Sequence, residues 1–174
     1  VEETPIDAAR YQFEVNLFGL ARLTQLIIPL MRDQGKGLII NVSSMGGQIY
    51  TPLGAWYHAT KHAVEAWSDC LRMEVRPFGI DVVIVQPGSI LTEFGDRLEQ
   101  HFDGDENGPY GASIKGLNKA MKTAAENKSG SPVSVLTDVI VRIIRADKPK
   151  TRYAKGALAR PLMFLHRDLP SRWY

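Results

Sequence analysis

The hydrophobic positions along this chain follow two different periods, and each period predicts a different kind of element. From residue 5 to residue 34, apolar side chains recur every three or four positions, which indicates one face of a long amphipathic helix. The same spacing predicts a second long helix over 55–76, ending before Pro77. Two short apolar runs, 38–43 and 80–85, are rich in β-branched residues, which is typical of buried strands.

The ends of the first predicted helix carry local signals. Thr4 is expected to cap it, with Asp7 completing a capping box and Pro5 at the first helical position. Pro29 is expected to kink or weaken the last turns, because proline lacks the amide hydrogen that a helix interior uses. Gly35 is expected to end the helix.

The order strand, helix, strand predicts a βαβ unit, and therefore a parallel sheet in an α/β fold. Further along, residues 131–132 open a third predicted helix, 150–154 is a candidate edge strand, and 157–174 has the pattern of an amphipathic helix. Residues 92–130 are rich in glycine and polar side chains. This composition predicts one or two short helices in a long connection, and it fits either a binding loop or disorder.

Composition places the chain among folded proteins that need no disulfide. Hydrophobic residues make up 44% and charged residues 23% of the 174 residues, which predicts a single domain over 1–174. The single cysteine, Cys70, excludes an internal disulfide, indicates a reducing, cytoplasmic location, and is expected to be buried in mid-helix. No run of about 18 apolar residues and no signal-peptide pattern occurs, so neither a transmembrane helix nor a leader is expected.

Positive charge gathers toward the C-terminal end. Residues 141–174 hold nine Lys and Arg against two Asp, a net charge of +7, whereas the whole chain carries +2. Such a stretch binds phosphates, nucleic acid or an anionic membrane surface when it acts as a site. Because no block of five like charges occurs, a solvated rim is the preferred interpretation. No nucleic-acid partner is expected, and peripheral membrane contact is the less favoured alternative.

The candidate chemistry lies in Ser44, Tyr57 and Lys61. Tyr57 and Lys61 are four residues apart on a predicted helix, so they share one face. Ser44 directly follows a predicted buried strand, at the sheet edge where α/β proteins bind ligands. A neighbouring ammonium is expected to lower the pKa of the phenol, which would suit Tyr57 to acid–base catalysis at an alcohol or carbonyl oxygen. Ser44 would hydrogen-bond the same oxygen.

Four motifs in the same order and spacing resemble the short-chain dehydrogenase/reductase family. Ser44 lies thirteen residues before Tyr57, which is the separation that the family uses. The resemblance is close from Asn16 to Thr92 and looser beyond. The matching motifs are V-N-L-F-G around Asn16, I-N-V-S-S-M-G-G over 40–47, Y-H-A-T-K over 57–61 and Q-P-G-S-I-L-T over 86–92.

This resemblance implies an NAD(P)-dependent oxidoreductase that interconverts an alcohol with a ketone or aldehyde, and it implies a role for each matching residue. Tyr57 would be the general acid/base. Lys61 would lower its pKa and bind the ribose hydroxyls of the nicotinamide half. Ser44 would polarise the substrate carbonyl, and Asn16 would hold a water that links Lys61 to solvent.

The resemblance also implies a cofactor site at the end of the second strand. Pro87 and Gly88 would let the backbone pass close to the nicotinamide ring, and the Ile90 backbone and the Thr92 hydroxyl would bind its carboxamide. The cofactor would be NADP or NAD, with the hydride chemistry belonging to the cofactor.

The sequence departs from the family pattern at its start. The family's first strand, its glycine-rich phosphate-binding turn and its N-N-A-G strand have no counterpart here. The chain also lacks an initiator Met. We therefore expect the C-terminal part of a doubly wound, Rossmann-like parallel sheet whose N-terminal strands are absent from this chain.

Residues 92–130 would form the variable substrate loop of such a protein. The resemblance of the tail to members that act on steroids, retinoids or similar molecules suggests a lipophilic carbonyl substrate. The candidates for the wall of an apolar pocket are Phe94, Leu98, Phe102, Tyr110 and Met121.

The family commonly forms dimers or tetramers through two long helices, here 5–34 and 55–76. The second helix carries an apolar stripe of Val64, Trp67, Leu71 and Val75, which by periodicity is core or interface. The resemblance favours the interface. His58 and His62 lack a nearby third ligand, so a solvent-facing pair and no metal site are expected. The alternative to an enzyme is a non-catalytic, cofactor-binding or interaction protein of the same fold.

Overall fold

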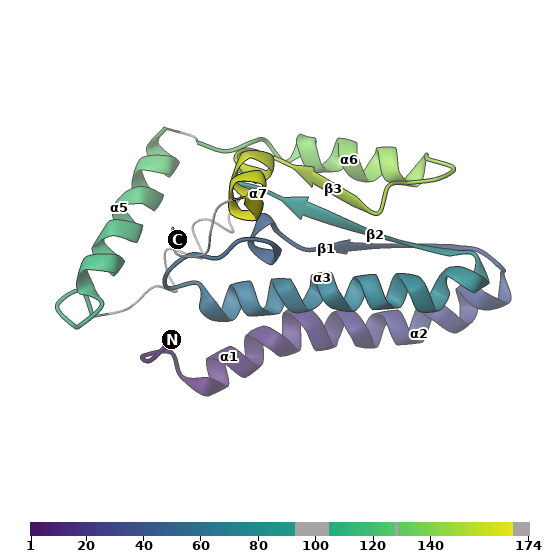
Figure 1. The fold of residues 1–174 in the computed structure, drawn as a ribbon, viewed down its shortest axis with the longest axis horizontal. Coiled ribbons are helices and arrows are strands. Elements are labelled where there is room, and N and C mark those ends of the chain that lie inside the picture. The colour runs from purple at the N-terminus through teal and green to yellow at the C-terminus, as the bar shows by residue number, and fades with distance from the viewer. Residues whose placement is uncertain (93–104, 128, 169–174) are drawn as a thin grey trace.

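The computed structural model describes residues 1–92, 105–127 and 129–168. Figure 1 shows a sheet with long helices along one side and a shorter helix along the other. In chain order the elements are α1 (Ile6–Phe13), η1 (Glu14–Phe18), α2 (Gly19–Asp33), β1 (Gly37–Val42), η2 (Met45–Gly47), α3 (Ala55–Val75), η3 (Arg76–Phe78), β2 (Ile80–Pro87), α5 (Gly111–Glu126), α6 (Ser134–Ile144), β3 (Arg152–Lys155) and α7 (Ala159–Asp168).

Among the described residues, the sheet has three parallel strands in the order β1-β2-β3. Gly37 pairs with Ile80 at the start of the β1–β2 ladder, and Pro87 pairs with Lys155 at the end of the β2–β3 ladder. The parallel βαβ unit and the short edge strand predicted from the hydrophobic pattern are therefore confirmed. The carboxyl ends of the parallel strands lie at one edge of the sheet, where the loop after β1 and the segment after β2 both begin.

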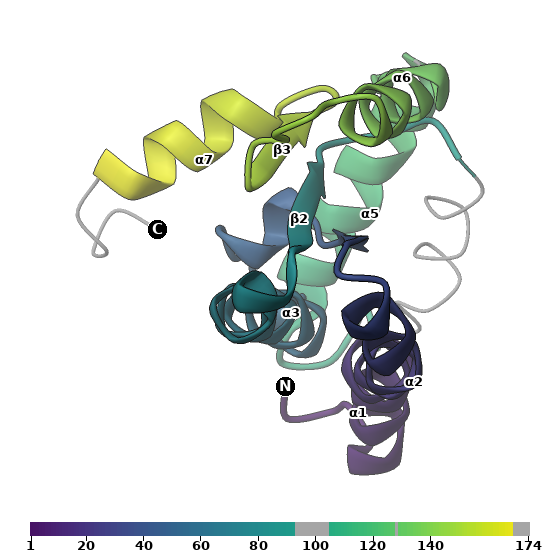
Figure 2. The same cartoon turned by 90° about the vertical axis from the view of Figure 1, so that its right-hand side faces the viewer.

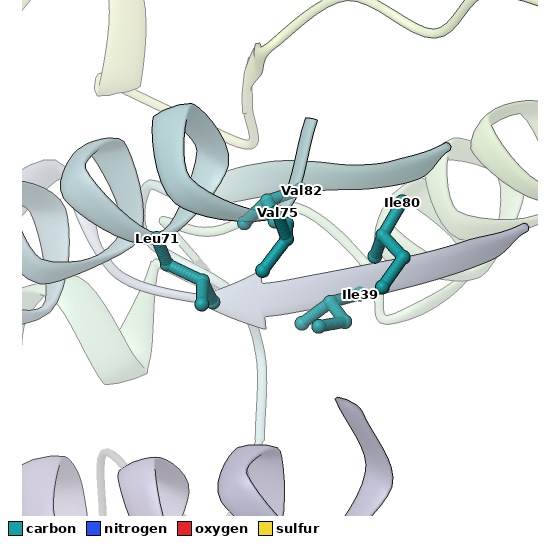
Figure 3. Packing of buried hydrophobic residues seen from close by; sticks show 5 residues of the cluster. All are labelled: Ile39, Leu71, Val75, Ile80 and Val82. Atoms are coloured by element: carbon teal, nitrogen blue, oxygen red, sulfur yellow. The ribbon is translucent and has the colours of Figure 1, made fainter. Parts of the chain in front are cut away.

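The two faces of the sheet bury two separate apolar layers. Successive side chains of a strand point to opposite faces, so β2, buried along almost its whole length, feeds both layers. Each fully buried Val, Leu or Ile contributes about 1.5–3 kcal/mol. The layer beneath α2 and α3 contains Ile39, Leu71, Val75, Ile80 and Val82 (Figure 3), and the layer beneath α6 contains Val83, Val85, Val139 and Ile143.

The apolar stripe on α3 belongs to this core. Val64, Leu71 and Val75 are buried, and Trp67 packs against the same layer. The interface role that the family resemblance favoured for this stripe is therefore wrong, because these side chains already face the sheet within one chain. Cys70 lies off the stripe and is exposed, so its predicted burial is also wrong.

The first predicted helix is continuous from Ile6 to Asp33 but contains a π-helical segment at Glu14–Phe18. Its predicted start is wrong: Pro5 is the N-cap and no side chain caps the helix. The backbone N–H of Ala9 bonds the Pro5 carbonyl, which places the first helical residue after the proline. The helix continues through Pro29, and Gly35 follows its end at φ 65°.

Figures 1 and 2 show α2 running beside α3 along the sheet. The outer side of α2 exposes large apolar residues, among them Leu23 at 71% and Leu30 at 58%. By length and composition alone, the helix over Ile6–Asp33 is apolar enough to cross a membrane, contrary to the sequence expectation. A single helix of this kind is weak support for a membrane span, since core helices of soluble proteins meet the same condition.

Within the long connection, the described part is dominated by one helix, α5, which stands apart at the left of Figure 1. Residues 93–104 and 128 lie outside the described residues, and so do three of the predicted pocket residues, Phe94, Leu98 and Phe102. The Tyr110 hydroxyl donates to Glu2 at 2.6 Å and the residue is exposed. The predicted pocket wall remains a prediction.

Candidate active site

Ser44 lies just past the carboxyl end of β1, as its sequence position predicted. Its backbone is extended, and its Oγ accepts a hydrogen bond from the Gly46 N–H at 3.0 Å, which starts the η2 turn. The turn packs on α3. This fold-back lets the Ser44 side chain hydrogen-bond the Tyr57 side chain near the start of α3.

Tyr57 and Lys61 lie one turn apart on α3 and face the same strand end. The Lys61 Nζ donates to the carbonyl of Val42, the last residue of β1, at 3.2 Å. The same nitrogen lies 5.9 Å from the centre of the Tyr57 ring. The structure therefore brings Ser44, Tyr57 and Lys61 together, which the spacing in the sequence had predicted.

Burial controls the electrostatics of this group. It raises the pKa of the Tyr57 phenol, and the hydrogen bond from Ser44 opposes that rise. Burial also lowers the pKa of the Lys61 ammonium, and the Glu65 carboxylate opposes that fall. The lowered phenol pKa expected from the lysine is thus not found in this structure, because desolvation outweighs the other influences. At neutral pH Tyr57 is a phenol, the form that donates a proton.

Asn16 approaches the site from the π-helical segment of the first helix. Its Nδ2 donates to the Thr60 Oγ1 at 3.1 Å, and Thr60 in turn donates to the Tyr57 carbonyl at 2.8 Å. A π-helical turn inside an α-helix widens the turn and is frequent at functional sites. Here it carries the one residue of this helix that the family resemblance assigned to the site. The water-holding role of Asn16 remains a prediction.

The predicted cofactor residues lie at the end of β2 and just beyond. Pro87 ends the strand, and the Gly88 N–H bonds the Lys155 carbonyl at 2.8 Å. A Cβ on Gly88 would lie 2.1 Å from the Ala157 carbonyl oxygen, so the close approach of this neighbouring segment leaves no room for a side chain here. Ile90 forms a bridge with Ser131. Thr92 is exposed at the last described position before 93–104.

His58 is buried, so the prediction of a solvent-facing histidine pair is wrong for this residue. Its Nδ1 lies 2.9 Å from the Gly46 carbonyl, and its Nε2 accepts the Thr51 N–H at 3.1 Å. His58 therefore braces the loop that carries Ser44. His62 is exposed, and among the described residues no group of three or more His, Cys, Asp or Glu is placed to hold a metal.

Glu65 is a residue near the site that sequence reasoning missed. It is buried on α3, one turn after Lys61, and bonds Arg152 of β3 through the Arg152 Nε at 3.0 Å. One signal was present in the sequence: Tyr57, Lys61, Glu65 and Asp69 recur every four residues and so share a helix face. The partner of Glu65, 87 residues away, carried no such signal.

A parallel sheet that is covered by helices on both faces and carries hydroxyl, phenol and ammonium groups at its carboxyl edge defines a Rossmann-like α/β protein. The family model of the short chain dehydrogenases matches residues 1–103. The chain belongs to this family, which confirms both the resemblance seen in the motifs and the partial Rossmann-like fold.

Two relatives and one solved structure give the extent of the similarity. A probable short-chain type dehydrogenase/reductase, VdlC, of Helicobacter pylori is 33% identical over 176 residues, covering 100% of this chain and 63% of the relative. An NADPH-dependent 3-dehydrocapnine reductase of Ornithobacterium rhinotracheale is 33% identical, covering 97% and 61%. The crystal structure of a short-chain dehydrogenase from Streptomyces avermitilis matches with a TM-score of 0.77 at 32% identity, covering 96% and 59%. The chain thus spans about three fifths of the length of these relatives.

Proposed function

We propose that the protein containing this chain is an NAD(P)-dependent oxidoreductase that interconverts a carbonyl compound and an alcohol. The observation that carries the proposal is the meeting of Ser44, Tyr57 and Lys61 at the carboxyl edge of the sheet, with Ser44 hydrogen-bonded to Tyr57. The protonated phenol would donate a proton to the carbonyl oxygen in the reductive direction. Ser44 would hold that oxygen as negative charge develops on it.

The donor groups at this edge fit the nicotinamide end of a dinucleotide. The Lys61 ammonium and the Tyr57 phenol lie together beside β1, where they would bind ribose hydroxyls. Pro87 ends the neighbouring strand and Gly88 follows it, where their backbone would pass close to the nicotinamide ring. The Ile90 backbone and the Thr92 hydroxyl, just beyond, would hold its carboxamide. When bound, the nicotinamide supplies the hydride. The Ornithobacterium relative is an NADPH-dependent reductase, which makes NADPH the first cofactor to test.

Three further proposals accompany this function. The substrate would be a lipophilic ketone or alcohol, with 92–130 as the substrate loop of a domain to which all of 1–174 belongs. The protein would act in the cytoplasm. It would form a dimer or tetramer through the first helix and α3, a proposal supported by the apolar residues that α2 exposes.

The test is Tyr57→Phe in the full-length protein, assayed with NADPH and NADH against a panel of ketones. Losing the hydroxyl should lower kcat by about 100-fold or more, which is the range of general acid catalysis. Tyr11→Phe is the matched control, because Tyr11 is exposed on α1. Unchanged turnover in Tyr57→Phe would remove Tyr57 from the mechanism.

Measurements on the wild-type protein distinguish the non-catalytic alternative from the enzyme. A cofactor-binding or interaction protein would bind NADPH or NADH in a fluorescence titration and yet turn over none of the ketones. The presence of Asn16, Ser44, Tyr57 and Lys61 together favours the enzyme, since a protein without the reaction has no need to keep all four.

A further inference from the structure

Glu65 is a buried carboxylate directly behind the candidate site. The residue is 4% exposed and lies one helical turn after Lys61 on α3. Its Oε1 accepts a hydrogen bond from the Gln86 side chain at 3.0 Å. Its Oε2 accepts from Gln48 at 3.3 Å and from Arg152 at 3.0 Å. A buried charge is costly unless it is paired and hydrogen-bonded, and Glu65 meets both conditions.

The three donors come from the three segments that frame the site. Gln48 is the C-cap of η2, the turn that begins at Ser44. Gln86 is the residue of β2 just before Pro87. Arg152 opens β3, the strand that pairs with that end of β2. Each segment is thereby tied to one carboxylate on the helix that carries Tyr57 and Lys61.

We propose that Glu65 is a positioning residue of the reaction: it fixes the Ser44 turn and the end of β2 against α3, and it places a carboxylate one helical turn from the Lys61 ammonium. This inference rests on the proposed function. It is supported by the charges around Glu65, which are Lys61 and Asp69 on its own helix and Arg152 on β3, whereas η2 and β2 contribute amides. The carboxylate also opposes the lowering of the Lys61 pKa by burial.

The structure supplies a matched control in the same cluster. Asp69, one turn beyond Glu65, binds both Arg152 and Arg72, so removing either acid leaves Arg152 with one carboxylate partner. Asp69 lies two turns from Lys61. It bonds the two arginines, whereas Gln48 and Gln86 bond Glu65. A purely structural role for the cluster predicts similar effects of Glu65→Gln and Asp69→Asn.

The experiment compares these two variants with the wild type in the full-length protein. For Glu65→Gln, kcat should fall by about tenfold or more, toward the roughly 100-fold that a misplacement of about 1 Å can cost. The alkaline limb of its kcat profile should move to lower pH, because Lys61 loses the charge that favours its ammonium form. Asp69→Asn should leave kcat and the alkaline limb unchanged, even if it lowers the thermal midpoint. Equal effects of the two variants on kcat and on the pH profile would overturn the inference.

A cofactor-free measurement separates this inference from the proposed function. Lys61 is titrated by NMR of the lysine side chains, with Lys61→Met assigning its resonance, and should titrate at lower pH in Glu65→Gln than in the wild type or Asp69→Asn. If Lys61 titrates at the same pH in Glu65→Gln as in the wild type, and the wild type turns over ketones, only the role of Glu65 is overturned. Absence of turnover in the wild type would instead defeat the proposed function.

If Glu65→Gln does not fold, Glu65→Asp replaces it. The shorter side chain keeps the negative charge but withdraws it from Gln48 and Gln86, whose bonds to Glu65 span 3.3 and 3.0 Å. This variant should lower kcat by a similar factor while leaving the alkaline limb in place, since the charge near Lys61 remains. Wild-type kcat in Glu65→Asp would contradict the positioning role.

Discussion

At the scale of single residues, the site combines function with a local cost in stability. Lys61 is held half-buried against Val42, and burial lowers the pKa of its ammonium. A group whose pKa is lower in the folded than in the unfolded state binds fewer protons when folded, so stability rises with pH between the two values. The cost of the charged lysine is therefore fully present below the folded-state pKa and disappears near the ordinary pKa of 10.5.

Replacing Lys61 by the uncharged Met should therefore stabilise the protein while it removes activity. We expect the thermal midpoint at pH 7 to rise by about 2 °C or more, with the gain shrinking toward pH 10.5. Calorimetry across this pH range measures it. An exposed lysine, Lys36→Met, is the control and should show no such trend. A lower midpoint for Lys61→Met at neutral pH would mean that the bond to Val42 outweighs the desolvation.

At the scale of elements, the end of β2 is held by close packing between segments. Gly88 lies where a side chain would meet the Ala157 carbonyl, between β3 and α7. Gly88→Ala should therefore push the end of β2 away from this link. Overpacking of this kind costs about 1–3 kcal/mol, and it should also lower kcat because Pro87 and Ile90 adjoin this glycine.

Gly116 in α5 provides the opposite case, because a Cβ there would meet nothing within 4 Å. Gly116→Ala should stabilise the protein by about 0.5–1 kcal/mol, since alanine loses less backbone freedom in a helix. Denaturant unfolding of both variants measures the contrast. Equal effects in the two variants would show that the Ala157 contact is relieved without cost.

At the scale of the whole molecule, the sequence predicted those features that depend on residues close together along the chain. The hydrophobic periods gave the long helices and the parallel strands, and motif spacing gave Ser44, Tyr57 and Lys61, because these depend on residues close along the chain. Environments set by distant segments were missed. Glu65 is buried and bonds Arg152, which lies 87 residues away in the sequence, and no local pattern encodes that contact.

The outer side of α2 is part of the proposed interface through which the whole protein would form a dimer or tetramer. Leu23, Leu26 and Leu30 are exposed along this helix, and large apolar side chains in a row favour a covering partner. Leu23→Glu in the full-length protein should shift a dimer or tetramer to smaller species in sedimentation velocity, because a buried unpaired charge disfavours association. Ile144→Glu is the control, since Ile144 is 62% exposed on α6, across the sheet. An unchanged assembly with a lowered thermal midpoint in Leu23→Glu would mean that α2 packs within its own chain, and the proposed interface would be wrong.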